Sequence, residues 1–190
     1  MLTEKEKMLN GKPYYPADRN LAAERNNAKK LCFEYNSLPP SQGKKKQLII
    51  KKLFGKTDGN FLIEPFFNCD YGYNIEIGKN FYMNHNGVIL DCAKVTFGDN
   101  VLIGPNCGFY TAMHPVEPNE RLTGLEAAKP ITVGSNVWFG GNVVVLPGVT
   151  IGDNSVIGAG SVVTKSIPPN VVAVGNPCKV LRTIAENDTL

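Results

Sequence analysis

The chain has 190 residues, 43% of them hydrophobic, and its 20 Lys and Arg against 17 Asp and Glu give a formal net charge of +3. This length and apolar content can bury a core, which excludes a disordered chain, and the near balance of charge argues against a dedicated binder of nucleic acid. No apolar stretch approaches the roughly 18 residues that a membrane span needs. The first residues lack the apolar segment of a secretory signal, and five scattered cysteines fit a reducing compartment, so we expect a cytoplasmic protein.

Residues 1–56 are strongly basic and have the pattern of helices. They hold 13 Lys and Arg against 5 Asp and Glu, a net charge of +8, whereas residues 57–190 carry a net charge of −5. Thr3 and Glu6 are spaced as a capping box, and Asp18 is placed to cap a second helix. We therefore expect residues 1–56 to form an N-terminal helical cap.

From residue 57 onward the dominant signal is a period of six residues. Apolar side chains recur six positions apart, and small or β-branched residues follow several of them by four positions. The apolar positions are Ile77, Met83 and Ile89, then Phe97, Ile103 and Phe109, and finally Val133, Phe139, Val145, Ile151, Ile157 and Val163; the small or β-branched ones are Val137, Val143, Val149, Ser155 and Ser161. Neither a helix nor a simple strand has this period, so each unit is one short strand and one corner.

Three such units close one triangular coil, and stacked coils bury the apolar side chains that a single coil leaves exposed. A sandwich or a propeller would need strands of about 5 to 6 residues at spacings of about 8 to 12, which this sequence lacks. The expected fold is therefore mainly β: a parallel β-helix of hexapeptide repeats over residues 57–182, with an N-terminal helical segment and a C-terminal tail at 183–190.

One segment interrupts the repeat without shifting it. Phe109 and Val133 are 24 positions apart, which is four whole periods, so we expect residues 110–130 to leave and re-enter the coil as an extended, extruded loop. The loop carries His114, one of only two histidines. A neutral imidazole there can take a proton from a hydroxyl, but a histidine that only hydrogen-bonds locally explains the sequence equally well. The other histidine, His85, is expected to decorate a corner.

Three of the seven cations after residue 56 lie near the last coil, at Lys165, Lys179 and Arg182. In a net acidic segment this grouping favours a phosphate-bearing ligand, although ordinary surface solvation explains it equally well. Because the chain has two histidines in all, a zinc centre held by three imidazoles is excluded, and we expect no metal.

Several segments together resemble the maltose and galactoside O-acetyltransferases of the left-handed β-helix acyltransferase superfamily. They are the blocks NVWFGGNVVVLPGVTIGDNSVIGAGSVVTKSIPPNVVAVGNPCKV and FFNCDYGYNIEIGKNFYMNHNGVILD, the TAMHP loop, and the N-terminal stretch GKPYYPADRNLAAER. The resemblance covers nearly the whole chain and is closest to the maltose type. It implies a left-handed parallel β-helix and an enzyme that uses acetyl-CoA, needs no metal, and works as a homotrimer with active sites between neighbouring subunits.

The resemblance also implies roles for individual residues. His114 matches the general base, which would act on the 6-hydroxyl of a sugar, and the backbone N–H of Gly141 matches the donor to the tetrahedral oxyanion. The acceptor-binding positions are Asp18, Asp70, Tyr82, Asn84, Asp91 and Glu126. The positions that bind the acetyl donor are Trp138, Gly141, Ala159, Thr164, Lys165, Lys179 and Arg182, which include the three grouped cations.

The choice of acceptor remains open at this point. Several of the acceptor residues have a competing structural role: Asp18 as a helix cap, Asn84 and Asp91 as corner residues, and Tyr82 as packing. Asp70 and Glu126 resemble the maltose type, which tilts the acceptor toward glucose or maltose. A few hydrogen bonds decide sugar selectivity, and a sequence does not orient them.

Two other functions are compatible with the same residues. A xenobiotic acetyltransferase acting on an antibiotic hydroxyl would use the same histidine and the same groove for CoA. A non-catalytic β-helix trimer would serve as a scaffold and would not bind CoA. A panel of acceptors separates the first alternative from a sugar acetyltransferase, and CoA binding separates the second.

Overall fold

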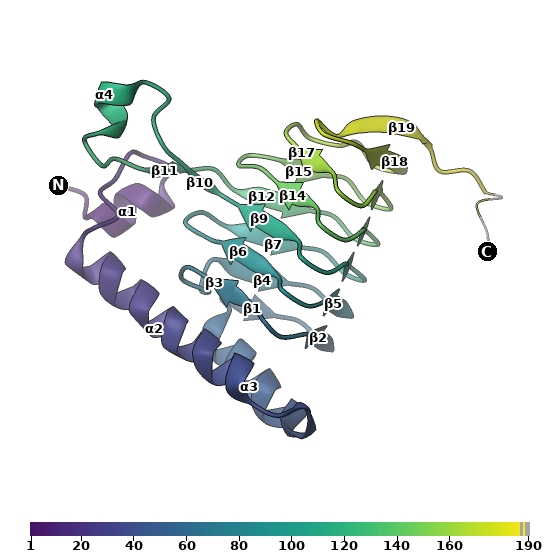
Figure 1. The fold of residues 1–190 in the computed structure, drawn as a ribbon, viewed down its shortest axis with the longest axis horizontal. Coiled ribbons are helices and arrows are strands. Elements are labelled where there is room, and N and C mark those ends of the chain that lie inside the picture. Colours follow the sequence, from purple (N-terminus) through teal and green to yellow (C-terminus); the bar gives the residue numbers. More distant parts are fainter. Residues whose placement is uncertain (187, 189–190) are drawn as a thin grey trace.

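The computed structural model describes residues 1–186 and residue 188. Short parallel strands wind into a stacked coil, and helices cover one flank of the coil and the end at which β1, β2 and β3 lie (Figure 1). The segment that carries α4 projects from the coil on the same side as α1, whereas β19 lies on the opposite side. In the part of the chain described, no helix is long and apolar enough to cross a bilayer.

The N-terminal segment forms the helices expected of it. They are α1 (Glu4–Leu9), α2 (Arg19–Ser37), the short 3-10 helix η1 (Pro40–Gln42) and α3 (Gly43–Leu53). Thr3 and Glu6 make the reciprocal bonds of a capping box, and the Asp18 carboxylate accepts from the N–H groups of Asn20 and Leu21. The expected caps of the first two helices are therefore confirmed.

The cap closes the open end of the coil. Leu31 of α2 and Ile50 of α3 are buried in the same apolar cluster as the interior of the coil. The side chain of Asn36 exchanges two hydrogen bonds with the backbone of Phe67, at 2.8 and 2.9 Å. These contacts cover apolar side chains and satisfy backbone groups that a terminal coil would otherwise expose.

The strands of the coil form three sheets in the described residues, one on each face, and the order within each face follows the stacking of the coils. The first face contains β1 (Lys56–Thr57), β4 (Ile75–Ile77), β7 (Val95–Phe97), β12 (Ile131–Val133) and β15 (Thr150–Ile151). The second face contains β2 (Phe61–Ile63), β5 (Phe81–Met83), β8 (Leu102–Ile103), β13 (Trp138–Phe139), β16 (Val156–Ile157), β18 (Val171–Val174) and β19 (Lys179–Thr183). The third face contains β3 (Asn68–Cys69), β6 (Val88–Leu90), β9 (Gly108–Tyr110), β14 (Val144–Val145) and β17 (Val162–Val163).

The six-residue period is the vertical register of these faces. Each apolar position pairs with the equivalent position of the next coil, as in Phe97 with Val133 on the first face and Phe109 with Val145 on the third. All the predicted apolar positions and their small or β-branched companions are buried. Phe109 contacts Phe97 and Phe139 edge to face, at centroid distances of 5.0 and 5.3 Å. The interior is therefore a continuous stack, as the period predicts.

An asparagine ladder runs along the corner between the first and second faces. The side-chain amide of each asparagine donates to the side-chain oxygen of the next at 2.9 Å, through Asn80, Asn100, Asn136, Asn154 and Asn170. Each has a positive φ between 55° and 61°, a conformation that asparagine tolerates better than other residues with a side chain. The ladder fixes the turn and the spacing of successive coils at once.

The corner between the third and first faces departs from the regular spacing. Successive inward residues across it are eight positions apart at Cys69 and Ile77 and again at Ile89 and Phe97, instead of six. The next crossing, from Phe109 to Val133, takes 24 positions. This corner alone carries the extruded segment, so extra chain is concentrated at one edge of the coil.

The extruded segment, residues 110–130, has more structure than the extended loop we expected. β10 (Ala112–Met113) pairs antiparallel with β11 (Ala127–Ala128), and α4 (Pro118–Arg121) lies between them. The C-terminal segment also differs from expectation, because β19 runs antiparallel to β18 and continues to Thr183, the first residue of the expected tail. Pairing with β18 covers the edge that the last parallel strand would expose.

The ladder generates a test of corner stability. Replacing Asn136 by glycine keeps a residue that accepts positive φ but removes two ladder bonds, whereas Asn136→Ala removes the bonds and adds left-handed strain. We expect the alanine variant to be less stable than the glycine variant by about 1 kcal/mol, measured as the free energy of unfolding in urea. Equal stabilities would show that backbone strain at this corner is not significant.

Candidate active site

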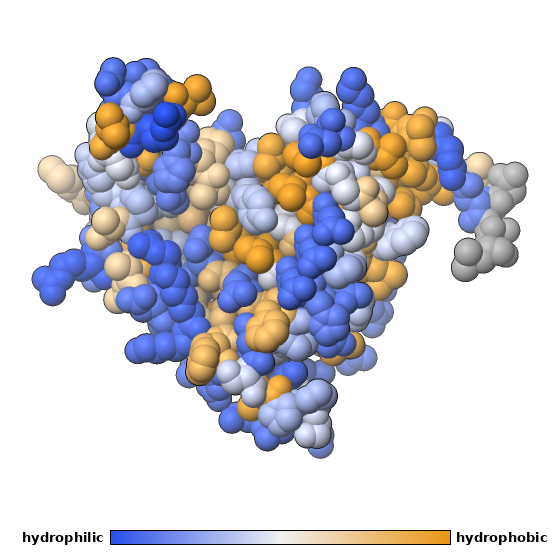
Figure 2. Space-filling view, in the orientation of Figure 1, coloured by the Kyte–Doolittle hydropathy of each residue, from blue (hydrophilic) through white to orange (hydrophobic). Residues whose placement is uncertain are grey.

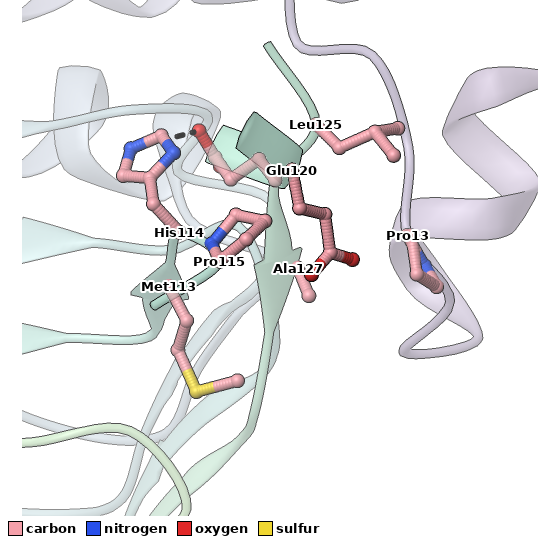
Figure 3. A pocket seen from close by; sticks show the side chains of 8 residues that line it. Pro13, Met113, His114, Pro115, Glu120, Leu125 and Ala127 are labelled. Atoms are coloured by element: carbon pink, nitrogen blue, oxygen red, sulfur yellow. Dashed lines mark ion pairs between the residues drawn. The ribbon is translucent and has the colours of Figure 1, made fainter. Parts of the chain in front are cut away.

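A cleft of about 180 Å³ lies between the extruded segment and the chain that precedes α2 (Figure 3). It is lined by Pro13, Met113, His114, Pro115, Glu120, Leu125, Glu126 and Ala127. The cleft therefore joins the N-terminal cap to the irregular corner of the coil. Its polar side chains are one imidazole and two carboxylates, a composition suited to binding and deprotonating a hydroxyl.

His114 directly follows β10, at the point where the extruded segment leaves its paired strands. Its side chain is 58% exposed, and its Nε2 atom lies 4.0 Å from Oε2 of Glu126, which is only 12% exposed (Figure 3). The antiparallel pairing of β10 with β11 places the two residues side by side, because Met113 pairs with Ala127. The imidazole is thus accessible to a ligand, with a carboxylate beside it.

Tyr14 ties Glu126 to the N-terminal cap. The two residues exchange backbone hydrogen bonds at 2.9 and 3.0 Å, and the Tyr14 hydroxyl donates to Oε1 of Glu126. Burial, followed by the neighbouring Cys92 and Glu126, raises the pKa of the Tyr14 phenol. The phenol therefore stays protonated as a hydrogen-bond donor, and the extruded segment is held against the cap at this position.

A buried carboxylate organises the turn that carries Asp70. Asp91 is fully buried, and its two oxygens accept from the backbone N–H groups of Asp70, Tyr71, Gly72 and Asn74 at 2.7 to 3.3 Å. Both oxygens are committed to these bonds, so Asp91 holds the turn and offers no exposed surface to a ligand. Asp91 therefore acts on the shape of the corner and does not contact the acceptor.

Asp70 remains available at the edge of this turn. Cys92 donates its thiol to Oδ2 of Asp70 at 3.5 Å, and burial raises the pKa of the Asp70 carboxyl. The charge of Glu126 contributes to the same shift. Asp70, Glu126 and His114 thus belong to one end of the molecule, around the irregular corner.

The other predicted acceptor residues lie elsewhere. Asp18 caps α2 and borders a separate open cavity between α1 and α2. Tyr82 lies on β5 of the second face, and Asn84 follows at the corner where its side-chain oxygen accepts from the N–H of His85. One chain therefore does not gather all six predicted acceptor residues in one cleft.

The predicted acetyl-donor residues lie mostly on the second face and on its corner with the third face, whereas Thr164 and Lys165 lie on the corner between the third and first faces. Trp138 on β13 is 55% exposed, and Ala159 is exposed at the corner between the second and third faces. At the same corner, none of the hydrogen bonds found among residues 1–186 and 188 uses the Gly141 N–H as donor. Thr164 and Lys165 follow β17 and are exposed. Lys179 and Arg182 lie on β19, where Arg182 forms an ion pair with Asp188 at 2.5 Å.

The cleft with His114 and the second face, which carries Trp138 and β19, lie on different sides of the coil. The strands of the second face and β19 lie across the coil from α1, β10, β11 and α4 (Figure 1). Apolar side chains gather on the surface over β18 and β19, where Val180 and Leu181 are 47% and 64% exposed (Figure 2). The histidine and the donor groove of a single chain are therefore not part of the same cleft.

Comparison with known proteins agrees with this architecture. A family described as the maltose acetyltransferase hexapeptide capping motif matches residues 7–59, and the bacterial transferase hexapeptide family of six repeats matches residues 130–165. Galactoside O-acetyltransferase of Escherichia coli (strain K12) is 48% identical over 183 residues, which cover 96% of this chain and 90% of that protein.

Two solved structures superpose on nearly the whole chain. A maltose O-acetyltransferase from Clostridium difficile 630 has a TM-score of 0.96 and 50% identity, covering 97% of this chain and 99% of its own. A galactoside acetyltransferase in complex with coenzyme A has a TM-score of 0.95 and 47% identity, covering 99% and 94%. The chain belongs to the maltose and galactoside O-acetyltransferase family. It is an acetyltransferase of this type, and the family resemblance that the sequence carries is confirmed.

Two residues near the cleft of this chain, Tyr14 and Cys92, were not predicted from the sequence to belong to the site. Tyr14 lies in the stretch GKPYYPADR, and its contact with Glu126 spans 112 positions that no period relates. Cys92 lies between Ile89 and Phe97, where the irregular corner has two residues more than the regular period, and this difference in spacing was the signal that could have identified it.

His85 lies exposed at a corner, as expected, and its Nδ1 atom is 2.5 Å from the carbonyl oxygen of Pro65. Within the described residues, no group of three His, Cys, Asp or Glu side chains could hold a metal ion.

The buried carboxylate generates a second test. In Asp91→Asn, an amide NH₂ replaces one oxygen and faces two buried N–H donors that lose their acceptor. We expect a loss of about 2 to 4 kcal/mol in the free energy of unfolding. The matched control is Asp99→Asn, because Asp99 accepts from the Lys79 N–H at a more exposed corner, and it should change stability by less than about 0.5 kcal/mol. Equal effects of the two changes would contradict the role assigned to Asp91.

Proposed function

We propose that this acetyltransferase moves the acetyl group of acetyl-CoA to a hydroxyl, the 6-hydroxyl, of glucose, maltose or a related sugar. The observation that carries the proposal is the accessible imidazole of His114 beside a carboxylate in a cleft of about 180 Å³. The complex of a 47% identical galactoside acetyltransferase with coenzyme A supports CoA as the carrier of the acetyl group.

In the proposed reaction, His114 takes the proton of the acceptor hydroxyl as its oxygen attacks the thioester carbonyl carbon. The new C–O bond forms and the carbonyl becomes a tetrahedral oxyanion, which the Gly141 N–H stabilises. Collapse of this intermediate breaks the C–S bond and releases the CoA thiolate, which takes the proton from the imidazolium. The products are the acetyl ester and CoA, and no acyl-enzyme forms.

On the acceptor side, carboxylates are the main recognition groups. Glu126 can accept hydrogen bonds from sugar hydroxyls close to His114, and Glu120 lines the same cleft. Asp70 does not line this cleft and is proposed as a further acceptor contact at the edge of the neighbouring turn. Asp18, Tyr82 and Asn84 remain proposed acceptor contacts, with Asp18 also serving as a helix cap. The aspartate at position 70 and the glutamate at position 126 resemble the maltose type and favour glucose or maltose.

On the donor side, the proposed groove uses one aromatic side chain, backbone groups and three cations. Trp138 offers an exposed ring, and the corner with Gly141 and Ala159 offers backbone to the pantetheine arm. Thr164 borders the groove in this proposal, and the phosphates are bound by Lys165, Lys179 and Arg182. All three cations are exposed and available to a ligand, although Arg182 must exchange its partner Asp188.

The proposal requires more than one copy of the chain. Because the second face lies across the coil from the extruded segment, His114 of one chain meets the donor groove of another. We therefore propose a homotrimer with its active sites between neighbouring subunits. The exposed apolar side chains of the second face, Leu62, Leu102 and Trp138, suit such an interface.

Removal of the imidazole tests the base. We expect His114→Ala to lower kcat by roughly 10²- to 10⁴-fold while leaving CoA affinity intact. The assay is release of the CoA thiol from acetyl-CoA with glucose, maltose and a galactoside as acceptors. His85→Ala is the matched control, because it removes the other imidazole at an exposed corner. Full turnover by the His114→Ala protein would refute the proposed mechanism.

The acceptor panel and CoA calorimetry separate the alternatives. Acetylation of chloramphenicol or a streptogramin, with none of the sugars modified, would replace the sugar assignment by a xenobiotic one. Absence of CoA binding in calorimetry would favour a non-catalytic scaffold.

A further inference from the structure

We propose that Glu126 is the electrostatic partner of His114 and that Tyr14 of the N-terminal cap positions Glu126. The inference rests on the proposed function, because it takes His114 as the base. It gives the cap a part in the reaction beyond closing the end of the coil. The observation behind it is the chain of contacts from the buried Tyr14 through Glu126 to the exposed imidazole.

The geometry suits charge stabilisation. Oε2 of Glu126 lies 4.0 Å from Nε2 of His114, and the carboxylate side chain is 12% exposed, so water screens it less than a surface carboxylate. When His114 takes the proton of the acceptor hydroxyl, its ring becomes positively charged. The neighbouring negative charge stabilises the imidazolium as it forms in the transition state. The proton stays on the imidazole until the CoA thiolate takes it, and no bond forms to Glu126.

Tyr14 leaves Glu126 little freedom to turn away. The Tyr14 ring is fully buried, its hydroxyl donates to Oε1 of Glu126, and the backbones of the two residues pair in both directions. One oxygen of the carboxylate is thereby committed to the phenol and the other faces the imidazole. A hydrogen bond from a neutral donor holds a carboxylate without cancelling its charge, so Tyr14 can orient Glu126.

The other ionisable groups around Glu126 are consistent with this role. Cys92 and Asp70 face it from the irregular corner, and Glu120 lines the cleft from α4. Burial, followed by the charge of Glu126, raises the pKa of the Cys92 thiol, so this thiol is neutral. In the described residues, the carboxylate that forms an ion pair with His114 is Glu126.

The first test removes the charge and keeps the shape. We expect Glu126→Gln to lower kcat by about 10- to 100-fold, with CoA affinity unchanged. The loss should fall on kcat, with KM for the acceptor little changed, because the glutamine side chain keeps an oxygen that can accept a hydrogen bond from the sugar. A carboxylate that only supports the loop would raise KM for the acceptor and leave kcat in place, and that result would overturn the proposal. A rate equal to that of the wild type would overturn it as well.

The second test is a double-mutant cycle between the cap and the loop. Tyr14→Phe keeps the buried ring and removes only the hydroxyl, and we expect it to lower kcat by about 3- to 10-fold. In the Glu126→Gln background the same change should have almost no further effect, since Tyr14 acts through the carboxylate. Equal effects in both backgrounds would contradict the positioning role of Tyr14. Tyr15→Phe is the matched control, because it makes the same chemical change at a half-exposed neighbour.

Failure of this inference is distinguishable from failure of the proposed function. If His114→Ala is inactive while Glu126→Gln and Tyr14→Phe behave as the wild type, the base stands and the carboxylate partner is wrong. If His114→Ala is fully active, the proposed function itself is wrong. Equal CoA affinity by calorimetry in all variants confirms that the donor groove is intact in each, so that a lower rate reports on the cleft.

Discussion

The structure depends on one constraint, the vertical stacking of equivalent inward residues in successive coils. Phe97, Phe109 and Phe139 lie edge to face in the bore, and each parallel strand pairs residue for residue with the next coil. A one-residue slip in any strand would turn its buried side chain outward. The faces are therefore fixed by packing, and extra chain is tolerated only at the corners.

The protein concentrates its irregularity at a single corner, and the candidate chemistry is found there. The first two passages of the chain from the third face to the first each have two extra residues, which make room for the turn that Asp91 holds. The next passage carries the extruded segment with His114 and Glu126. The N-terminal cap then reaches the same corner through Tyr14. A rigid scaffold thus carries a polar cleft whose groups are held by buried hydrogen bonds, an arrangement that suits a reaction requiring fixed geometry.

The repeating parts of the fold could be predicted from sequence because they depend on local period. The apolar register, the capping box at Thr3 and the cap at Asp18 are all confirmed. The antiparallel pairing of β10 with β11, the course of β19 and the contact between Tyr14 and Glu126 could not be predicted, because each joins segments that no period relates. For Asp91 the sequence left a corner role and an acceptor role open, because the four backbone donors that it binds converge on it only after the corner has folded.

The most direct test of this account is whether one active site needs residues from two chains. His114→Ala removes the base, and Ala159→Phe places a bulky ring at the exposed corner proposed to bind pantetheine, so each protein alone should be inactive. Co-assembly of the two in equal amounts should restore about a quarter of wild-type turnover, because random trimers then contain sites with an intact histidine from one chain and an intact groove from its neighbour. Mixed assemblies that form but show no activity would contradict a site shared between subunits.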